Sequence, residues 1–225
     1  MSEVIVRSAA GVTLVGGGPV SATMLALARA HAPRLVAADA GADRLLRLGA
    51  VPEAVIGDFD SVSAAARAAF ADRLHPISEQ ETTDFDKALR SVAAPFTLGV
   101  GFAGARMDHG LAVLNTLARY PDRRCLILGA QDVTFLAPPD VTLDLARGTR
   151  LSLFPLGPVR GESRGLVWPI GGIDFAPGGA IGTSNRVADG PVRLEFDAPR
   201  MLVILPRAAL PRALAALVPP DARGG

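Results

Sequence analysis

The 225-residue chain has only one cysteine, one tryptophan, one tyrosine and one lysine. A single cysteine, Cys125, cannot form a disulfide within the chain, which fits a reducing compartment. Because Cys125 stands in the apolar run 125–128, we expect a buried, unreactive thiol rather than a nucleophile. All basic residues except Lys87 are arginines, and alanine is abundant, so a coding bias is the simplest explanation for the shortage of lysine.

The chain also lacks an excess of charge, since its formal net charge is +1. Binding to nucleic acid or to a membrane surface in general needs a strong basic excess, so we expect neither partner. No stretch reaches the roughly 18 consecutive apolar residues of a membrane-spanning helix, and residues 1–11 do not resemble a secretory signal. We therefore expect a cytoplasmic protein, whose 49% hydrophobic residues suffice for a sizeable core.

The first part of the chain alternates strand-like and helix-like segments. A stripe of apolar residues at i, i+3, i+4 and i+7 starts at Phe85 and predicts a helix, and Thr83 with Asp86 resembles the capping box that begins one. The expected strands are 12–15, 34–38, 55–56, 96–100 and 124–128, with helices at 21–32, through 45–48, at 63–74, 85–92 and 111–117. Strands alternating with helices predict an α/β domain with a mainly parallel sheet.

The pattern changes near Pro138-Pro139. Beyond this point, short strand candidates are separated by glycine and proline, and they lie at 150–154, 165–170, 192–196 and 201–205. A helical pattern returns only at 207–218. We expect a nucleotide-binding α/β domain over 1–139 and a smaller, mainly β domain over 140–225, with a sandwich as the favoured architecture.

Polar clusters follow several of the predicted strands in the first domain. Asp39 follows one strand, Asp58 and Asp60 follow another, and the segment 106–109 follows a third. Ligands bind at the carboxyl ends of the strands in doubly wound sheets. We therefore expect these clusters to converge on one crevice.

The segment Asp58-Phe59-Asp60 suggests a metal site. In an extended loop the two carboxylates point the same way and can share one hard cation. The alternative is a solvated turn in which Asp60 or Ser61 caps the next helix. Asp84, in the first turn of a predicted helix, would supply a third carboxylate and complete a Mg²⁺ site shared with phosphates, although it also suits the positive end of that helix.

Other residues allow two interpretations each. The run Gly16-Gly17-Gly18 could bring backbone N–H groups to a phosphate or form a tight turn. Arg106 and Asp108 could bind phosphate, ribose or metal, or Asp108 could be a helix N-cap. Lys87 could pair with Asp84 on the helix surface or face the crevice. We expect His31 to end a helix, His75 to lie in a loop and His109 to be structural rather than a base. Trp168 could belong to the core or form an aromatic platform for a flat, cationic ligand.

Together these segments resemble the thiamine pyrophosphokinase family. The resemblance extends from about residue 12 to 205 and rests on six blocks in order, 39–44, 56–61, 83–89, 104–109, 165–168 and 183–185. It implies a Rossmann-like domain followed by a β-sandwich, in a homodimer that binds thiamine where subunits meet. Two departures, Ala40 and Asp43, replace a glycine and an asparagine of the usual first block, and Ala105 replaces a further glycine.

The resemblance also implies an activity and its residues. ATP would give a pyrophosphoryl group to the hydroxyl of thiamine, with AMP leaving, and positioning and charge neutralisation would supply most of the catalysis. Mg²⁺ would be held by Asp58, Asp60 and Asp84. The nucleotide side would comprise Asp39, Thr83, Arg106 and Asp108, and the thiamine side Gln80, Trp168, Ser184 and Asn185.

Two other functions remain open from the sequence. The segment Asp58-Phe59-Asp60-Ser61-Val62 resembles the nucleophile loop of haloacid-dehalogenase phosphatases, in which Asp58 would be phosphorylated and Asp60 would be the acid and base. That interpretation leaves the second domain unexplained. A non-catalytic domain that senses a nucleotide or thiamine would keep the pocket without turnover.

Overall fold

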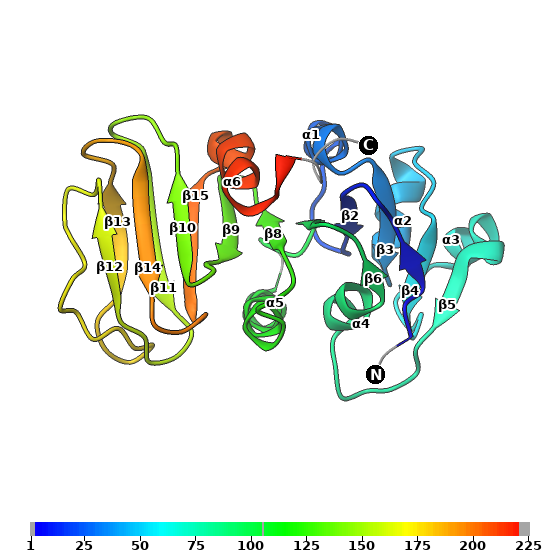
Figure 1. Cartoon of the computed structure of the whole chain (residues 1–225). Coiled ribbons are helices and arrows are strands. Elements are labelled where there is room, and N and C mark those ends of the chain that lie inside the picture. The colour runs from blue at the N-terminus through cyan, green and yellow to red at the C-terminus, as the bar shows by residue number, and fades with distance from the viewer. Residues whose placement is uncertain (1–2, 105, 221–225) are drawn as a thin grey trace. The chain divides into compact units, whose positions relative to one another are not determined.

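The computed structural model describes residues 3–104 and 106–220 and divides the chain into two compact units (Figure 1). The first unit comprises residues 3–116 and 127–130, and the second comprises 117–126 and 131–220. The strand Asp132–Leu136 therefore belongs to the second unit, whereas we expected the boundary at 139/140. We describe each unit by itself.

The first unit has an α/β architecture. Its strands are β1 (Val6–Arg7), β2 (Val12–Val15), β3 (Arg34–Ala38), β4 (Ala54–Gly57), β5 (Leu74–Pro76), β6 (Val92–Ala93), β7 (Thr97–Val100) and β8 (Cys125–Leu128). Its helices are α1 (Ala22–His31), α2 (Gly41–Arg47), α3 (Ala64–Ala69), the short 3₁₀ helix η1 (Ala71–Arg73), α4 (Asp84–Arg90) and α5 (Met107–Arg119). The boundary between the two units passes through α5 and β8.

The main sheet of this unit is parallel and doubly wound. β7 pairs with β2, β2 with β3, β3 with β4, and β4 with β5, all in parallel. The order runs outward from β2 in one direction through β3, and then returns to the other side of β2 with β7. The carboxyl ends of β2 and β7 therefore form the switch point at which such sheets bind ligands. The expectation of a mainly parallel α/β domain is confirmed.

Side-chain caps fix where three helices begin. The Ser21, Ser63 and Thr83 side chains accept hydrogen bonds from backbone N–H groups three residues later, so each is an N-cap. The cap at Thr83 confirms the expected start of α4. The suggestion that Asp60 or Ser61 caps the next helix is wrong, because Ser63 does so. Asp108 is likewise not an N-cap, since α5 already begins at Met107.

The second unit is mainly β, as expected. Its strands are β9 (Asp132–Leu136), β10 (Asp140–Leu143), β11 (Arg150–Pro155), β12 (Gly161–Arg164), β13 (Gly182–Arg186), β14 (Val192–Phe196) and β15 (Met201–Pro206), followed by η2 (Arg207–Ala209) and α6 (Leu210–Leu217). The antiparallel order β13-β11-β15-β9 forms one layer, and β10-β14-β12 forms another. Fully buried leucines of β10 and β11, Leu143, Leu151 and Leu153, contribute to its core.

The strand expected at 165–170 is wrong. β12 lies earlier, at Gly161–Arg164. The next residue, Gly165, has a φ of +81°, a backbone conformation that does not continue a strand. After it, Leu166 forms an isolated bridge with Val187. The segment is therefore a loop, and it carries Trp168.

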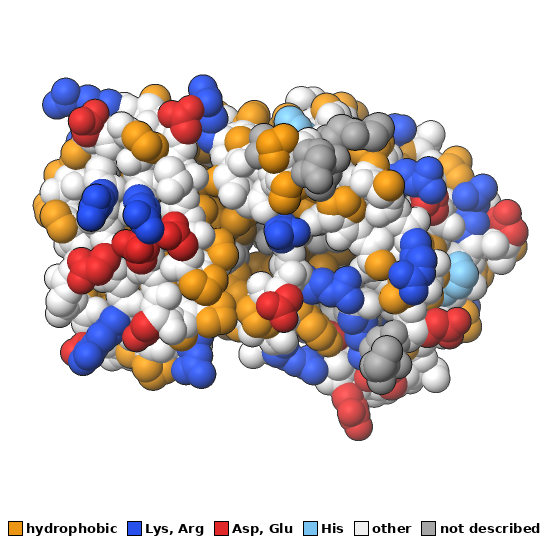
Figure 2. All heavy atoms as spheres, in the orientation of Figure 1, with side chains coloured by type: hydrophobic (Ala, Val, Ile, Leu, Met, Phe, Trp, Pro, Cys, Tyr) orange, Lys and Arg blue, Asp and Glu red, His pale blue; other side chains and the backbone are white. Residues whose placement is uncertain are grey.

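Charges of both signs are mixed on the face shown in Figure 2. In the β10-β14-β12 layer, Arg193 lies 2.6 Å from a carboxylate oxygen of Asp140 and 2.9 Å from one of Glu195. Such exposed pairs contribute little to stability, but they neutralise the surface. Among the helices that the structure describes, none combines the length and the apolar character needed to cross a membrane.

Candidate functional site

A pocket of about 430 Å³ lies at the carboxyl ends of the parallel strands. Segments that follow β2, β3, β4 and β7, together with the starts of α4 and α5, line it. The lining residues are Gly16, Gly17, Gly18, Ala38, Asp39, Ala40, Asp58, Asp60, Ser61, Gln80, Thr82, Thr83, Asp84, Phe85, Lys87, Gly101, Phe102, Arg106, His109 and Val113. The predicted convergence of the polar clusters on one crevice is thus confirmed for Asp39, Asp58, Asp60 and Arg106.

Asp39 is buried at the end of β3 with an unusual backbone. Its φ is +43°, a left-handed conformation that non-glycine residues rarely adopt. Gly57 makes room for it, since a Cβ at Gly57 would lie 3.2 Å from Asp39 Oδ1. That oxygen is buried and accepts no hydrogen bond. Burial, followed by repulsion from Asp84, raises the pKa of Asp39 to about 6.

The loop after β4 turns sharply between its two aspartates. We expected an extended loop, but Phe59 is buried and has a φ of +67°. The Arg67 side chain supports this turn, because it donates hydrogen bonds to the carbonyl oxygens of Phe59 and Val62. As a result, one carboxylate oxygen each from Asp39, Asp58 and Asp60 lies within 4.8 Å of the others. The extended-loop argument was wrong, although the two carboxylates do meet.

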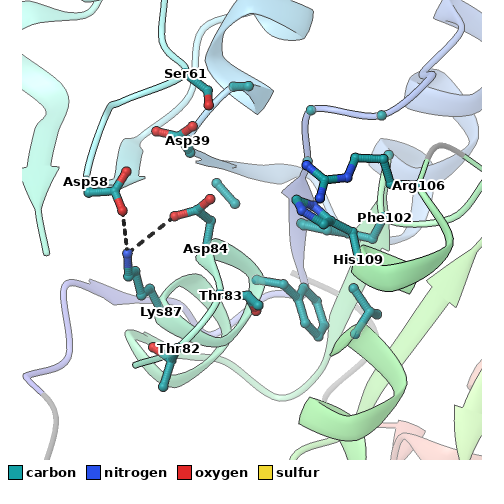
Figure 3. A pocket seen from close by; sticks show the side chains of 18 of the residues that line it. Asp39, Asp58, Ser61, Thr82, Thr83, Asp84, Lys87, Phe102, Arg106 and His109 are labelled. Atoms are coloured by element: carbon teal, nitrogen blue, oxygen red, sulfur yellow. Dashed lines mark hydrogen bonds and ion pairs between the residues drawn. The ribbon is translucent and has the colours of Figure 1, made fainter. Parts of the chain in front are cut away.

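Asp84 and Lys87 reach the same pocket from α4 (Figure 3). Lys87 Nζ lies 2.9 Å from Asp58 Oδ2 and 3.5 Å from Asp84 Oδ1. The hydrogen bond from Lys87 is the main reason that the pKa of Asp58 is lowered. Burial raises the pKa of Asp84, although Lys87 opposes this effect. The hypothesis that Lys87 faces the crevice is confirmed.

Gln80 and Thr83 lie beside these carboxylates. Gln80 Nε2 donates a hydrogen bond of 3.2 Å to Asp58 Oδ2, so it shares that oxygen with Lys87. Thr83 lines the pocket while its hydroxyl accepts the N–H of Asp86 at 3.4 Å. Both residues are therefore close to where a ligand of the acidic cluster would lie.

Arg106 lines the pocket, and Figure 3 shows it across from the aspartates. Asp108 is not among the described lining residues, because its carboxylate turns to the Arg106 guanidinium, with Oδ2 2.5 Å from Nη2. The pair is exposed, so it orients the guanidinium without burying it. Asp108 thus acts on the pocket through Arg106.

The glycine segment after β2 is held by its neighbours. Arg44 Nε donates to the carbonyl oxygen of Gly17 at 2.9 Å. A Cβ at Gly17 would lie 2.9 Å from the Cβ of Ala40, so glycine here leaves room for the methyl group that departs from the family pattern. Asp43, the second departure, accepts the N–H of Ser63 at 3.1 Å and ties α2 to the start of α3. The third, Ala105, lies outside the described residues.

Phe102 and His109 are among the lining residues that were not identified from the sequence. Phe102 follows β7, and its ring lies 4.6 Å from that of Phe85, centroid to centroid. We interpreted His109 as structural, but it faces the pocket from the first turn of α5. The sequence did carry a sign that Phe102 could line the pocket, because it comes two residues after the end of the predicted strand 96–100. No spacing distinguished His109 from a structural histidine.

The acidic cluster fits a hard divalent cation. Carboxylate oxygens are the ligands that Mg²⁺ and Ca²⁺ prefer, and three of them converge here. The buried, unpartnered Asp39 Oδ1 is a further sign, because such an atom is costly unless a cation or donor satisfies it. Asp39 belongs to this tight set, whereas Asp84 faces Lys87 at the edge of the same pocket.

In the second unit, Trp168 and Asn185 lie together. Trp168 is 56% exposed, so the core interpretation is wrong. Asn185 is buried, and its amide donates to the Trp168 carbonyl at 2.7 Å while Oδ1 accepts the Trp168 N–H at 3.3 Å. Ser184 is exposed on β13 with a φ of +61°. Asn185 thus orients the loop that presents the indole ring.

These features define a class of protein: an α/β domain with an acidic pocket at the carboxyl ends of the strands of a doubly wound sheet, followed by a β domain. The model of the thiamin pyrophosphokinase catalytic domain matches residues 25–128, and the model of the thiamin pyrophosphokinase vitamin B1 binding domain matches residues 140–201. The chain belongs to the thiamin pyrophosphokinase family.

Individual relatives agree with this assignment. Thiamine pyrophosphokinase 1 of Arabidopsis thaliana is 26% identical over 202 residues, which cover 74% of this chain and 76% of the relative. Thiamine pyrophosphokinase 2 of rice is 27% identical over 203 residues, with 75% and 76% covered.

Solved structures show the same fold. Yeast thiamin pyrophosphokinase superposes with a TM-score of 0.73 at 16% identity, covering 91% of this chain and 92% of that one. The Candida albicans enzyme gives 0.72 at 17% identity, with 87% and 89% covered. The two-domain architecture is therefore that of this family.

Proposed function

We propose that this enzyme transfers a pyrophosphoryl group from ATP to the hydroxyl group of thiamine, giving thiamine diphosphate and AMP. The observation that carries the proposal is the convergence of Asp39, Asp58 and Asp60 at the carboxyl ends of β3 and β4, in a chain of this family. Asp84, from the start of α4, adds a fourth carboxylate to the same pocket.

The pocket is suited to a nucleoside triphosphate together with its cation. Asp58, Asp60 and Asp84 would hold Mg²⁺ in this proposal, and Asp39, whose carboxylate lies close to those of Asp58 and Asp60, is a further candidate ligand. Bound Mg²⁺ would neutralise phosphate charge and so favour attack by a hydroxyl group. Glycine N–H groups after β2 suit phosphate oxygens.

The nucleotide side continues across the pocket. Arg106, oriented by Asp108, supplies a planar guanidinium that matches a phosphate group, and Thr83 offers a hydroxyl group from the start of α4. The Phe102 and Val113 side chains give this side an apolar surface, which suits a purine ring.

We assign the thiamine side to Trp168, Ser184 and Asn185 of the second unit and, in the first unit, to Gln80. The exposed Trp168 ring is a platform for the flat, cationic thiazolium of thiamine, and Ser184 lies on the neighbouring strand β13. Asn185 also holds the Trp168 backbone through two hydrogen bonds. Gln80, hydrogen-bonded to Asp58, is placed to meet the acceptor hydroxyl.

The chemistry is a displacement at the β-phosphorus of ATP. The thiamine hydroxyl oxygen forms the new bond to this phosphorus, and the bond from the β-phosphorus to the oxygen bridging it to the α-phosphorus breaks. AMP leaves with the bridging oxygen, and the hydroxyl proton passes to a pocket carboxylate or to water. The side chains align the two reactants and compensate charge, which can supply most of the rate acceleration.

We further propose a homodimer that works in the cytoplasm without nucleic-acid or membrane partners. The near-neutral net charge of the chain and the mixed charges in Figure 2 argue against a surface that binds polyanions in general. The exposed Val167, Trp168 and Ile181 provide apolar surface on the second unit that a second subunit could cover.

Product identification tests the reaction. The protein is incubated with thiamine, ATP and Mg²⁺, and the products are separated by ion-pair chromatography with mass detection. We expect thiamine diphosphate and AMP in equal amounts, and none after chelation of Mg²⁺. ADP or inorganic phosphate as the stoichiometric product would support a phosphatase or a different kinase, and binding without products would support a sensor.

A further inference from the structure

Lys87 occupies a place that the reaction described above does not account for. It is the single lysine of the chain, and its side chain is only 1% exposed although it borders the pocket. A buried ammonium group is costly unless it is paired and hydrogen-bonded. Its position in α4 therefore needs a compensating interaction.

The compensation comes from two carboxylates on different elements. Lys87 Nζ lies 2.9 Å from Asp58 Oδ2, in the loop after β4, and 3.5 Å from Asp84 Oδ1, one turn earlier in α4 (Figure 3). Burial alone would lower the pKa of Lys87, but its hydrogen bond to Asp58 and the charge of Asp84 raise it. The amine thus remains an ammonium ion.

The two partners carry the same charge and would otherwise repel each other. Asp39 and Asp60 add two more carboxylates to the pocket, so its acidic side has four acids and one internal cation. Like charges held close together in a partly desolvated site disfavour the folded arrangement. The ammonium ion offsets part of that repulsion.

We propose that Lys87 is a positioning residue whose ammonium ion holds the carboxylates of Asp58 and Asp84 in place before metal and nucleotide bind. This inference rests on the proposed function, since it concerns the same acidic site. Its consequence is a pre-arranged cluster that does not depend on a metal ion to fold. The same ammonium ion weakens divalent-cation binding, because it already supplies part of the positive charge.

The side chain must be lysine for steric reasons. An ammonium ion is compact and directs three donors to separate oxygens, whereas a guanidinium is planar and wide. In the space between Asp58 and Asp84, arginine would push the two carboxylates apart. Every other residue in the lysine and arginine set of the chain is an arginine, so lysine at this position departs from the general composition.

Lys87→Met tests the proposal, because methionine keeps much of the volume and removes the charge. Mg²⁺ binding is measured by calorimetry, thermal unfolding is followed with chelator and with Mg²⁺, and kcat is measured at saturating substrates. We expect Mg²⁺ to bind about tenfold more tightly, as for removal of a unit charge a few Å from a divalent ion in a water-like dielectric. The Mg²⁺-induced rise in Tm should increase accordingly, while kcat falls.

Arg90→Met is the matched control. Arg90 lies one turn further along α4 and pairs with Glu79 and Asp86, and it does not line the pocket. We expect Arg90→Met to lower Tm equally with and without Mg²⁺ and to leave the Mg²⁺ affinity unchanged. The same pattern in Lys87→Met would make Lys87 a purely structural residue and overturn the proposal.

Lys87→Arg keeps the proposal testable if the methionine variant does not fold. This variant retains the charge, so the gain in Mg²⁺ affinity expected for Lys87→Met should be absent, while kcat falls because the carboxylates are displaced. A wild-type kcat would overturn the positioning role. Failure of the proposed function is distinct, since the wild-type protein itself would then neither bind Mg²⁺ nor form AMP.

Discussion

At the scale of single residues, left-handed backbone conformations mark the candidate sites. Among the described non-glycine residues, positive φ occurs at Asp39, Phe59 and Ser184. Asp39 and Phe59 shape the acidic pocket, and Ser184 lies beside the Trp168 loop. Such conformations cost about 1 kcal/mol or more each and persist where the surroundings enforce them. The strain is thus concentrated where ligands are proposed to bind.

The acidic residues themselves could be predicted from the sequence, but their geometry could not. Asp58 and Asp60 stand out because two carboxylates follow a strand, and an extended loop would already place them together. The actual turn at Phe59 depends on its burial and on hydrogen bonds from Arg67, contacts that connect separate elements. His109 was missed because a histidine in a helix gives no sign of which way it faces.

Asp60→Asn provides the test at this scale. The amide keeps the size of the side chain but removes a charge that would hold the cation, so we expect kcat to fall on the order of 10²-fold or more. Asp60 is exposed, so Tm in chelator should stay unchanged. The exposed Asp72→Asn, on η1 outside the pocket, should retain full activity. The kcat of Asp60→Asn is measured by steady-state kinetics. A value close to that of the wild type would show that Asp60 does not belong to the site.

At the scale of elements, several strands with apolar residues were predicted, whereas the alternating strands β9 and β10 and the polar strands β12 and β13 were not. β2, β3, β14 and β15 match the expected positions closely, since their burial gives apolar runs or alternation. β12, with the sequence Gly-Glu-Ser-Arg, and β13, with Gly-Thr-Ser-Asn-Arg, have almost no apolar side chains. Their pairing with neighbouring strands, rather than their own sequence, makes them strands.

The packing of α2 against the sheet depends on one glycine. A Cβ on Gly41 would overlap the carbonyl oxygen of Val15 in β2, so backbone and helix must shift to admit it. We expect Gly41→Ala to lower the free energy of unfolding by about 1–3 kcal/mol, measured by urea denaturation. Gly110→Ala is the counterpart, because a Cβ there meets no atom within 4 Å. It should raise stability by about 0.5–1 kcal/mol, and equal effects of the two changes would contradict the packing argument.

At the scale of the whole molecule, the two units correspond to the two domain models of the family, which match residues 25–128 and 140–201. The first holds the acidic pocket, and the second presents Trp168 on a loop oriented by Asn185. The change from alternating helices and strands to strands alone made this division predictable from the sequence. The boundary was less predictable, because β9 adjoins the first unit in sequence but pairs with β15.

Trp168→Ala tests the division of labour. Loss of the ring should weaken thiamine binding by about 1–2 kcal/mol, the scale of a cation–aromatic contact, while ATP affinity stays constant. Tm should change little because Trp168 is exposed. Trp168→Phe, which keeps an aromatic face, should recover part of the affinity in calorimetric titrations. Equal losses for ATP and thiamine would show that the two units do not divide the substrates in this way.

The burial of Lys87 also gives the protein an internal reporter. Amine-reactive reagents find a single side-chain target in this chain, and that target is 1% exposed in the folded state. Acylation of the ε-amine must therefore wait for the chain to open around α4, so its rate follows the population of opened molecules. The extent of labelling at one position then reads the local opening equilibrium of the acidic pocket directly, without an engineered probe.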